Sequence, residues 1–312
     1  MPPAGEAILA GDHKTARRMA EDGSLLFKKE YLRMQQYHFS TSKILLNVII
    51  YFVLFLSGDF TNSVIFDGMF SVVTLPGSEW YIILRMTGCL LVTILFFWIY
   101  TTKHLHLKLA DFGITFQVKL WGVALSILLP AFVVIAFLII SKAECGTVSF
   151  SDMILVIIAS IITALKAGIL EEMLFRGFIM RLLENRWGKP LAILLPSVLF
   201  SLAHIPSMES FTVGGVVLLV ISGTLIGVMF SLIAYRGNSI SNNALIHSMW
   251  NLVMVTDILH ITTAQGTYGK PLIQILISSD NILLTGAGFG SEASLIAIIG
   301  YLLVCGIVIW NK

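Results

Sequence analysis

The chain has 312 residues, of which 57% are hydrophobic and 12% are charged, with a formal net charge of +2 and a mean hydropathy of +0.89. Globular proteins carry about a quarter charged residues, so a chain this apolar cannot cover a water-facing surface. The composition excludes a soluble enzyme, a disordered regulator and a nucleic-acid-binding protein, and it predicts a multi-pass protein of the lipid bilayer.

The N-terminal segment, residues 1–42, is polar and carries charges of both signs. It lacks the apolar stretch of a signal peptide, and residues 7–36 within it are predicted to form a helix that is either a cytoplasmic cap or an interfacial helix. The three cysteines of the chain (Cys89, Cys145 and Cys305) are far apart and odd in number, which indicates neither a disulfide framework nor a zinc knuckle.

Several segments further along resemble membrane-spanning helices, which need about 20 mostly apolar residues. In chain order they lie near residues 44–57, 81–100, 120–140, 153–170, 191–203, 213–234, 243–259 and 294–310. The fourth is predicted to continue as helix to about Leu183, because no break precedes Gly188-Lys189-Pro190. Two shorter apolar stretches, 60–75 and 271–284, are predicted to be interfacial or re-entrant.

These segments predict an all-α membrane protein with about eight transmembrane helices. In this interpretation residues 43–149 hold three accessory helices, and residues 150–260 form a catalytic core of four helices. Residues 261–312 then form an interfacial loop and the last transmembrane helix.

Lysine and arginine residues alternate along the connections in a way that predicts the orientation of the chain, because such residues collect in cytoplasmic loops. The first 43 residues contain seven of them, and the connection at 58–79 contains none. Basic residues return at 103–119 and 176–189 and at Arg236. The pattern predicts a multi-pass protein of the cell membrane with both termini in the cytoplasm.

Ionisable residues inside apolar segments are costly and mark functional sites, and here they gather between Lys166 and Asn251. Glu172 and Arg176 are four residues apart, so they share a helix face in the order that favours an ion pair. Glu171 is rotated by about 100° from Glu172 and lacks that partner. An unpaired carboxylate in apolar surroundings suits a general base; the alternative is a helix end whose charges meet water.

Two further segments each present a histidine. His204 follows Phe200 by one helical turn, and Asn243, His247 and Asn251 succeed one another at intervals of four residues, which makes a polar stripe. Taken singly, His204 fits a hydrogen-bonded packing residue, and the stripe fits hydrogen bonds that join two helices. Together, a carboxylate with an imidazole activates water, and an imidazole with an amide stabilises an oxyanion, so the set supplies the groups for amide hydrolysis.

Three patterns in this sequence resemble the three motifs of the CPBP family in their order and spacing. They are Glu171-Glu172-x-x-x-Arg176, Phe200-x-x-x-His204 and His247-x-x-x-Asn251. Its members are type II CAAX prenyl proteases and bacteriocin-processing or self-immunity proteins. The resemblance covers about residues 150–260. It implies an intramembrane endopeptidase with an all-α core that opens toward the cytosol.

The resemblance also implies a role for each residue. In the family's glutamate-dependent scheme, Glu171 and His204 activate the attacking water, His247 and Asn251 hold the oxyanion, and Glu172 with Arg176 supports the site. A zinc ion on Glu171, His204 and His247 is the alternative, because two histidines and a carboxylate can make a catalytic zinc site with an open position. The lack of a His-Glu-x-x-His helix and the metal-free scheme favour no metal.

One distance tests the water-activation scheme. If the helix at 191–203 runs outward from Pro190, His204 lies about 20 Å along it, whereas Glu171 lies near the cytoplasmic end of the preceding segment. The two meet only if the helix that carries Glu171 continues well beyond it, or if the next helix begins below the membrane surface. A separation above about 10 Å would rule the scheme out, because a base must reach its proton directly or through one water.

The expected partners are the bilayer and a membrane-associated protein or peptide, either a prenylated C-terminal peptide of the CAAX type or a bacteriocin-like or signal-peptide-like chain. Two other functions remain open. One is a non-catalytic membrane protein that gives self-immunity to a bacteriocin or binds a peptide, and the other is a transporter with these residues as a proton relay. Many transporters contain inverted repeats, which this sequence lacks, and the complete set of site residues favours the peptidase.

Overall fold

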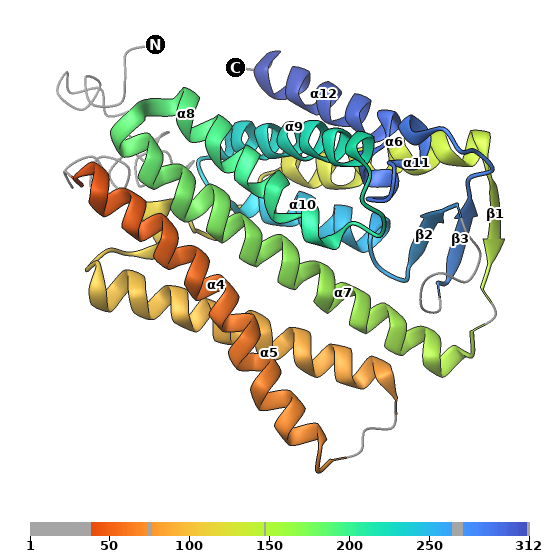
Figure 1. Ribbon diagram of the computed structural model, residues 1–312, viewed down its shortest axis with the longest axis horizontal. Helices are drawn as coiled ribbons and strands as arrows, with labels where there is room; N and C mark the ends of the chain where they lie inside the picture. The colour runs from red at the N-terminus through yellow and green to blue at the C-terminus, as the bar shows by residue number, and fades with distance from the viewer. Residues whose placement is uncertain (1–38, 74–76, 147, 264–270, 311–312) are drawn as a thin grey trace.

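In the computed structural model the chain forms a bundle of helices with one small sheet at its edge (Figure 1). The structure describes residues 39–73, 77–146, 148–263 and 271–310, so the helix predicted at 7–36 lies outside the described residues. The long helices are α4 (Thr41–Phe70), α5 (Ser78–Ile99), α6 (Leu120–Ile140), α7 (Phe150–Glu172), α8 (Met180–Ala203), α9 (Val213–Gly237), α10 (Ser241–Met254) and α12 (Leu295–Trp310). The predicted all-α fold class is confirmed.

Short elements connect the helices. They are the π-helices η1 (Tyr100–His104) and η3 (Met173–Ile179), the 3₁₀ turns η2 (Leu109–Phe112), η4 (Ile205–Ser207) and η5 (Ser291–Ala293), and the one-turn helix α11 (Ile282–Thr285). The sheet has the order β1 (Lys142–Cys145), β3 (Ile273–Leu276), β2 (Leu259–Thr262), with β3 antiparallel to β1 and parallel to β2. It lies at the end of the bundle where α7 and α12 begin (Figure 1).

The helix that begins as α7 does not stop at the candidate site. It continues through η3 into α8 without a break until Gly188, whose φ of 77° and ψ of 178° reverse the chain ahead of Pro190. A positive φ of this kind suits glycine, which has no Cβ to clash. The predicted continuation to about Leu183 is therefore confirmed, and the helix runs a few residues further, so Glu171 lies midway along a long helix rather than near a helix end.

Within the described residues, five helical runs are long and apolar enough to cross a membrane. They are Thr41–Phe70, Ser78–His104, Leu120–Ile140, Phe150–Ser207 and Val213–Gly237. The fourth run has 58 residues and contains two of the predicted spans on either side of the Gly188 turn. Since α10 has 14 residues and α12 has 16, both are shorter than a spanning helix needs. Each of the eight predicted segments contains a helix, but the number of helices of spanning length is smaller.

Three boundaries differ from the sequence expectation. The stretch predicted as interfacial from residue 60 is the continuation of α4 to Phe70, because no helix-breaking residue interrupts it. The stretch at 271–284 contains β3 and α11 instead of a re-entrant segment. The predicted seventh span ends at Met254, since Leu259 already pairs in β2. Strand pairing between distant segments overrides local apolar character at the last two places.

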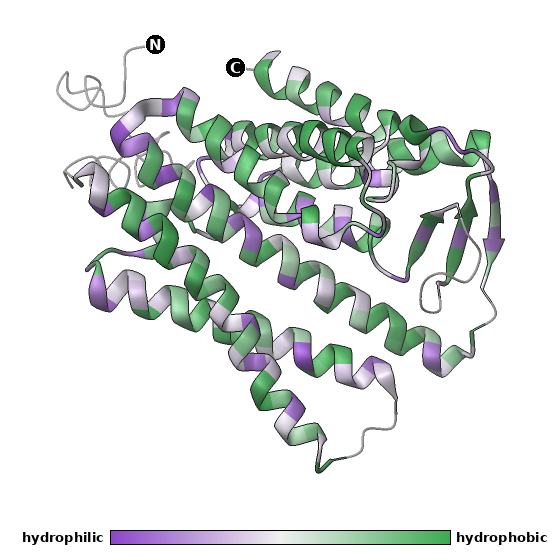
Figure 2. Cartoon of the chain, viewed as in Figure 1, coloured by the Kyte–Doolittle hydropathy of each residue, from purple (hydrophilic) through white to green (hydrophobic). Residues whose placement is uncertain are grey.

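The outer faces of the bundle are apolar. Ile139 on α6 and Leu302 on α12 are 78% and 54% exposed, and Figure 2 shows that hydrophobic residues make up most of the length of the helices. Large exposed apolar surfaces are unfavourable in water. Together with the five spanning helices, they show that the chain is an integral membrane protein.

Glycines bring the helices of the second half into close contact. A Cβ atom on Gly168 of α7 would lie 2.7 Å from the Ser248 backbone nitrogen and 2.9 Å from the Ala244 carbonyl oxygen on α10. A Cβ atom on Gly223 of α9 would meet Ser201 on α8 at 2.7–3.2 Å. Small residues allow such close approach between helices in lipid. These contacts set the spacing of the four helices that carry the candidate site.

Candidate active site

Glu172 and Arg176 form an ion pair in the interior of the bundle. The Arg176 Nη1 atom donates to Glu172 Oε1 at 2.9 Å, and neither side chain is exposed. The pair predicted from the four-residue spacing is therefore confirmed. The backbone changes from α-helix to the π-helix η3 directly after Glu172, and π-helical turns occur frequently at functional sites.

The Arg176 guanidinium joins three helices. Its Nη2 atom donates to the carbonyl oxygen of Gly227 on α9 at 3.2 Å. Its central carbon lies 4.7 Å from the ring centroid of Phe200 on α8 and 5.1 Å from that of Phe230 on α9. A buried charge is tolerated when it is paired and hydrogen-bonded, and aromatic ring faces attract a cation as well. Arg176 therefore holds α8 and α9 against the helix that bears Glu172.

Glu172 is also the anchor for two residues of α10. Its Oε1 atom is 2.9 Å from His247 Nδ1, and its Oε2 atom accepts a hydrogen bond from Asn243 Nδ2 at 3.3 Å. The ionised carboxylate beside Arg176 can only accept, so His247 Nδ1 carries a proton. Thus two members of the predicted polar stripe face Glu172, and the His247 ring is held with its Nε2 atom directed away from Glu172.

Glu171 lies opposite two imidazole nitrogens. Its Oε2 atom is 3.8 Å from Nε2 of His204 and 3.8 Å from Nε2 of His247. Among the described residues this buried oxygen has no hydrogen-bond partner. The separation from His204 is far below the 10 Å limit derived from the sequence, because Glu171 lies midway along the continuous helix that turns at Gly188. The geometric condition for joint action on one water molecule is met.

His204 is oriented by its own helix. Its Nδ1 atom is 2.7 Å from the carbonyl oxygen of Phe200, one turn earlier. A carbonyl oxygen only accepts hydrogen bonds, so Nδ1 carries a proton and Nε2 is the atom presented to Glu171. Ser207 Oγ donates to the His204 carbonyl oxygen at 2.7 Å and fixes the end of α8. Both histidines therefore present Nε2 to the same carboxylate oxygen.

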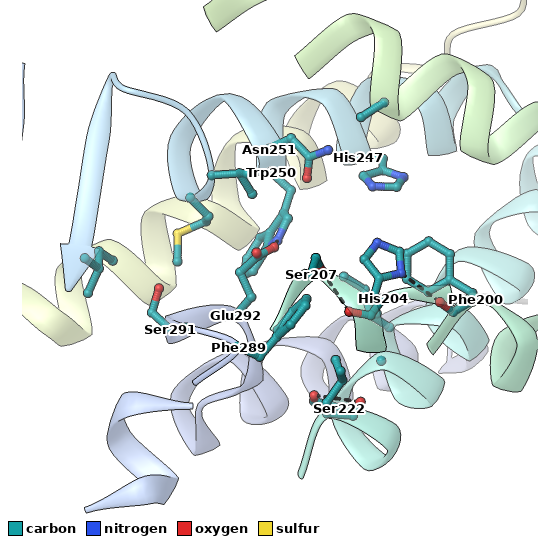
Figure 3. Close-up of a pocket in the computed structure, with 18 of the residues that line it drawn as sticks. Phe200, His204, Ser207, Ser222, His247, Trp250, Asn251, Phe289, Ser291 and Glu292 are labelled. Carbon is teal, nitrogen blue, oxygen red and sulfur yellow. Dashed lines mark hydrogen bonds between the residues drawn. The ribbon is translucent and has the colours of Figure 1, made fainter. Parts of the chain in front are cut away.

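A cavity of about 430 Å³ opens beside these atoms (Figure 3). Glu171, His204, His247 and Asn251 line it, whereas Glu172 and Arg176 lie behind its wall. In Figure 3, His247 and Asn251 project from α10 toward His204 on the facing wall. The structure thus brings all six predicted site residues together, four at the cavity and two as a buried support.

Glu292 is a cavity residue that the sequence interpretation missed. It lies in η5, outside the five spanning helices, and its Oε2 atom accepts a hydrogen bond from Trp250 Nε1 at 2.7 Å. Burial raises the pKa of this carboxyl, and the Trp250 hydrogen bond together with His204 and His247 opposes part of that rise. The available signal was an acidic residue in a glycine-rich stretch directly before an apolar helix.

The alternative zinc site would use Glu171, His204 and His247. In the ranges that the structure describes, no group of three or more His, Cys, Asp or Glu side chains is placed to hold a metal ion.

A comparison with protein families identifies the class of this site. Residues 153–253, about a third of the chain, match the family model described as type II CAAX prenyl endopeptidase Rce1-like. This segment contains all three motifs, so the family resemblance drawn from them is confirmed over the matched segment, and it supports a CAAX-type protease at the level of the family. Comparisons with curated proteins and with solved structures found no match. Glu292 lies beyond the matched segment.

Proposed function

We propose that this protein is an intramembrane endopeptidase in which Glu171 activates water to hydrolyse a peptide bond of a membrane-associated protein or peptide. The observation that carries the proposal is the convergence of His204 Nε2 and His247 Nε2 on Glu171 Oε2, at 3.8 Å each, on the wall of a cavity. Buried polar atoms are nearly always hydrogen-bonded. An oxygen left without a protein partner at such a point suits a bound water molecule.

In the proposed reaction Glu171 removes a proton from water while the water oxygen attacks the carbonyl carbon of the substrate. His204 orients the water and shares the proton through Nε2. The tetrahedral intermediate then collapses, the carbon–nitrogen bond breaks, and the proton passes to the leaving nitrogen. A positioned acid–base group of this kind contributes about 10²- to 10⁴-fold in rate.

The oxyanion is assigned to the other wall of the cavity. The Asn251 amide and His247 Nε2 stand on one face of α10, four residues apart. Donation from Nε2 requires the imidazolium form of His247, and the carboxylates of Glu172 and Glu171 stabilise that charge. Hydrogen-bond donors aimed at a developing negative charge are worth about 10²- to 10³-fold in rate.

Substrate accumulation in cells tests this function. In membranes that contain the His204→Ala variant, quantitative proteomics should find a precursor at its uncleaved length and lose the new N-terminus that the wild-type protein creates. The His104→Ala variant is the control, because His104 lies in η1 outside the cavity. Equal cleavage products from His204→Ala and wild-type membranes would overturn the proposal and favour the non-catalytic peptide-binding alternative.

A further inference from the structure

The two ends of the bundle differ sharply in charge. One end holds the start of α4, the α7–α8 turn and the end of α12, and the opposite end holds the sheet and the starts of α7 and α12 (Figure 1). In the described chain, lysines and arginines at the first end are Lys43, Lys103, Lys108, Lys119, Arg181, Arg186, Lys189 and Arg236. We call it the basic end.

The sheet end is poor in basic residues. Within the described ranges, the segments that connect helices there contain a single lysine, Lys142, and the sequence adds Lys270 between β2 and β3. Acidic residues are numerous in the same segments and in the adjoining helix turns: Asp67, Glu79, Glu144, Asp152, Glu209, Asp257 and Asp280. Since lysine and arginine collect on the cytoplasmic side of a membrane, the basic end is the cytoplasmic end.

The cavity lies at the other end. Its exposed lining residues, Ser207, Glu209 and Val255, belong to the segments that follow α8 and α10. His260 and Ile261 of β2 line it as well, which places its mouth beside the sheet. The second half of α8 leads from the turn at Gly188 to His204, about 24 Å at 1.5 Å per residue, so most of the helix length separates the basic end from the mouth.

We infer that the cavity opens on the non-cytoplasmic face of the membrane, so that its substrates are non-cytoplasmic segments of membrane-associated chains. The substrate part rests on the proposed function, and the orientation does not. The arrangement is the reverse of the cytosolic opening that the family resemblance implies. The sequence led to two expectations: that the basic residues lie on the cytoplasmic side, and that the site opens toward the cytosol. Because the cavity opens at the sheet end, opposite the basic end, only one of these expectations can hold.

The native cysteines provide the test. Cys145 is exposed on β1 at the sheet end, whereas Cys89 and Cys305 are buried. In right-side-out vesicles, a membrane-impermeant maleimide should label the wild-type protein at Cys145 and leave the Cys145→Ser variant unlabelled. Arg186→Cys in the Cys145→Ser background reports the basic end, and it should react only after the vesicles are opened.

Labelling of Arg186→Cys in sealed vesicles, with Cys145 protected until they are opened, would overturn the inference. The readout does not depend on catalysis. An inactive protein with accessible Cys145 would contradict the proposed function alone, and an active protein with the reverse labelling would contradict the orientation alone.

A second inference rests on a different observation, the carboxylate of Glu292. One of its oxygens is held by Trp250, and its backbone carbonyl accepts a hydrogen bond from the Tyr301 hydroxyl at 3.0 Å. No hydrogen bond among the described residues engages the other carboxylate oxygen, and the side chain lines the cavity. A buried carboxylate with one neutral donor is poorly compensated unless a cation or a proton joins it.

The lining of the cavity contains no lysine or arginine among the described residues, but it contains the three carboxyl groups of Glu171, Glu209 and Glu292. Arg176 is fully buried against Glu172 and does not reach the lining. The described lining therefore offers no cationic side chain to a substrate carboxylate. It does offer the Glu292 carboxylate, held by Trp250, to a substrate amine or guanidinium. The geometry points to Glu292 as a specificity residue that binds a lysine or arginine side chain near the scissile bond, a proposal that rests on the proposed function.

Binding to an inactive variant tests this role. In the Glu171→Gln background, fluorescein-labelled octapeptides are compared in which one position carries lysine, norleucine or glutamate among apolar residues. The lysine peptide should bind about tenfold more tightly than the norleucine peptide, a difference of about 1.4 kcal/mol. Adding Glu292→Gln should bring the ratio to about one, because its amide oxygen still accepts from Trp250 while the charge is lost. Adding Glu292→Lys should favour the glutamate peptide.

A ratio near one with Glu292 intact, or a preference for lysine that survives Glu292→Gln, would overturn the assignment. Cleavage of the same peptides by the wild-type protein is measured separately. Failure of cleavage with an intact lysine preference contradicts the proposed function and leaves Glu292 as a binding residue. An equal loss of cleavage for all peptides in the Glu292→Gln variant, with no change in binding, would make Glu292 a general acid and contradict the specificity role.

Discussion

Replacing Glu171 with glutamine is expected to lower the rate of peptide hydrolysis about 10³-fold with little change in folding. The amide has nearly the same shape as the carboxylate, but it cannot take a proton from water, and acid–base groups contribute about 10²- to 10⁴-fold. The side chain is not part of the buried ion pair, since its Oε2 atom has no hydrogen-bond partner among the described residues. Cleavage of the accumulating precursor by protein in detergent or nanodiscs measures the effect.

The matched control is Asp152→Asn, which neutralises a carboxylate in the first turn of the same helix, far from the cavity. It should cleave at the wild-type rate. Thermal unfolding of both variants should stay close to that of the wild-type protein. A Glu171→Gln variant that retains more than about a tenth of the wild-type rate while folded would contradict the role of Glu171 as the base.

The sequence predicted the local geometry of the site well. The pairing of Glu172 with Arg176 follows from a four-residue spacing, and such spacing holds whether or not the rest of the fold is known. The same reasoning placed His247 and Asn251 on one face of α10. These are local relations, fixed by the helical repeat alone.

The relations that the sequence did not predict depend on contacts between distant segments. The pairing of β2 with β3 ends the predicted seventh span early, and nothing local to Leu259 indicates it. Glu292 reaches the cavity only because the turn before α12 packs against Trp250 of α10. The opening of the cavity at the sheet end follows from the Gly188 turn, which lets the second half of α8 carry His204 back to the level of Glu171.

Replacing Arg176 with methionine is expected to be the most destabilising change at the site. Removing one partner of a buried ion pair leaves the other charge uncompensated and costs about 3–5 kcal/mol. Here the Glu172 carboxylate, with none of its side chain exposed, would lose its cationic partner. Thermal unfolding in detergent measures the loss. Hydrolysis should fall as well, because Glu172 also holds His247.

Arg186→Met is the control for this change, because Arg186 is exposed on the same continuous helix and should be replaced with little effect. The double variant Glu172→Gln/Arg176→Met separates charge from packing. Its glutamine oxygen still accepts from His247 Nδ1, and no unpaired charge remains, so it should regain at least half of the lost stability. If the single and double variants unfold alike, Arg176 stabilises the core through its contacts with Phe200 and Phe230, and the ion pair is not the main contribution.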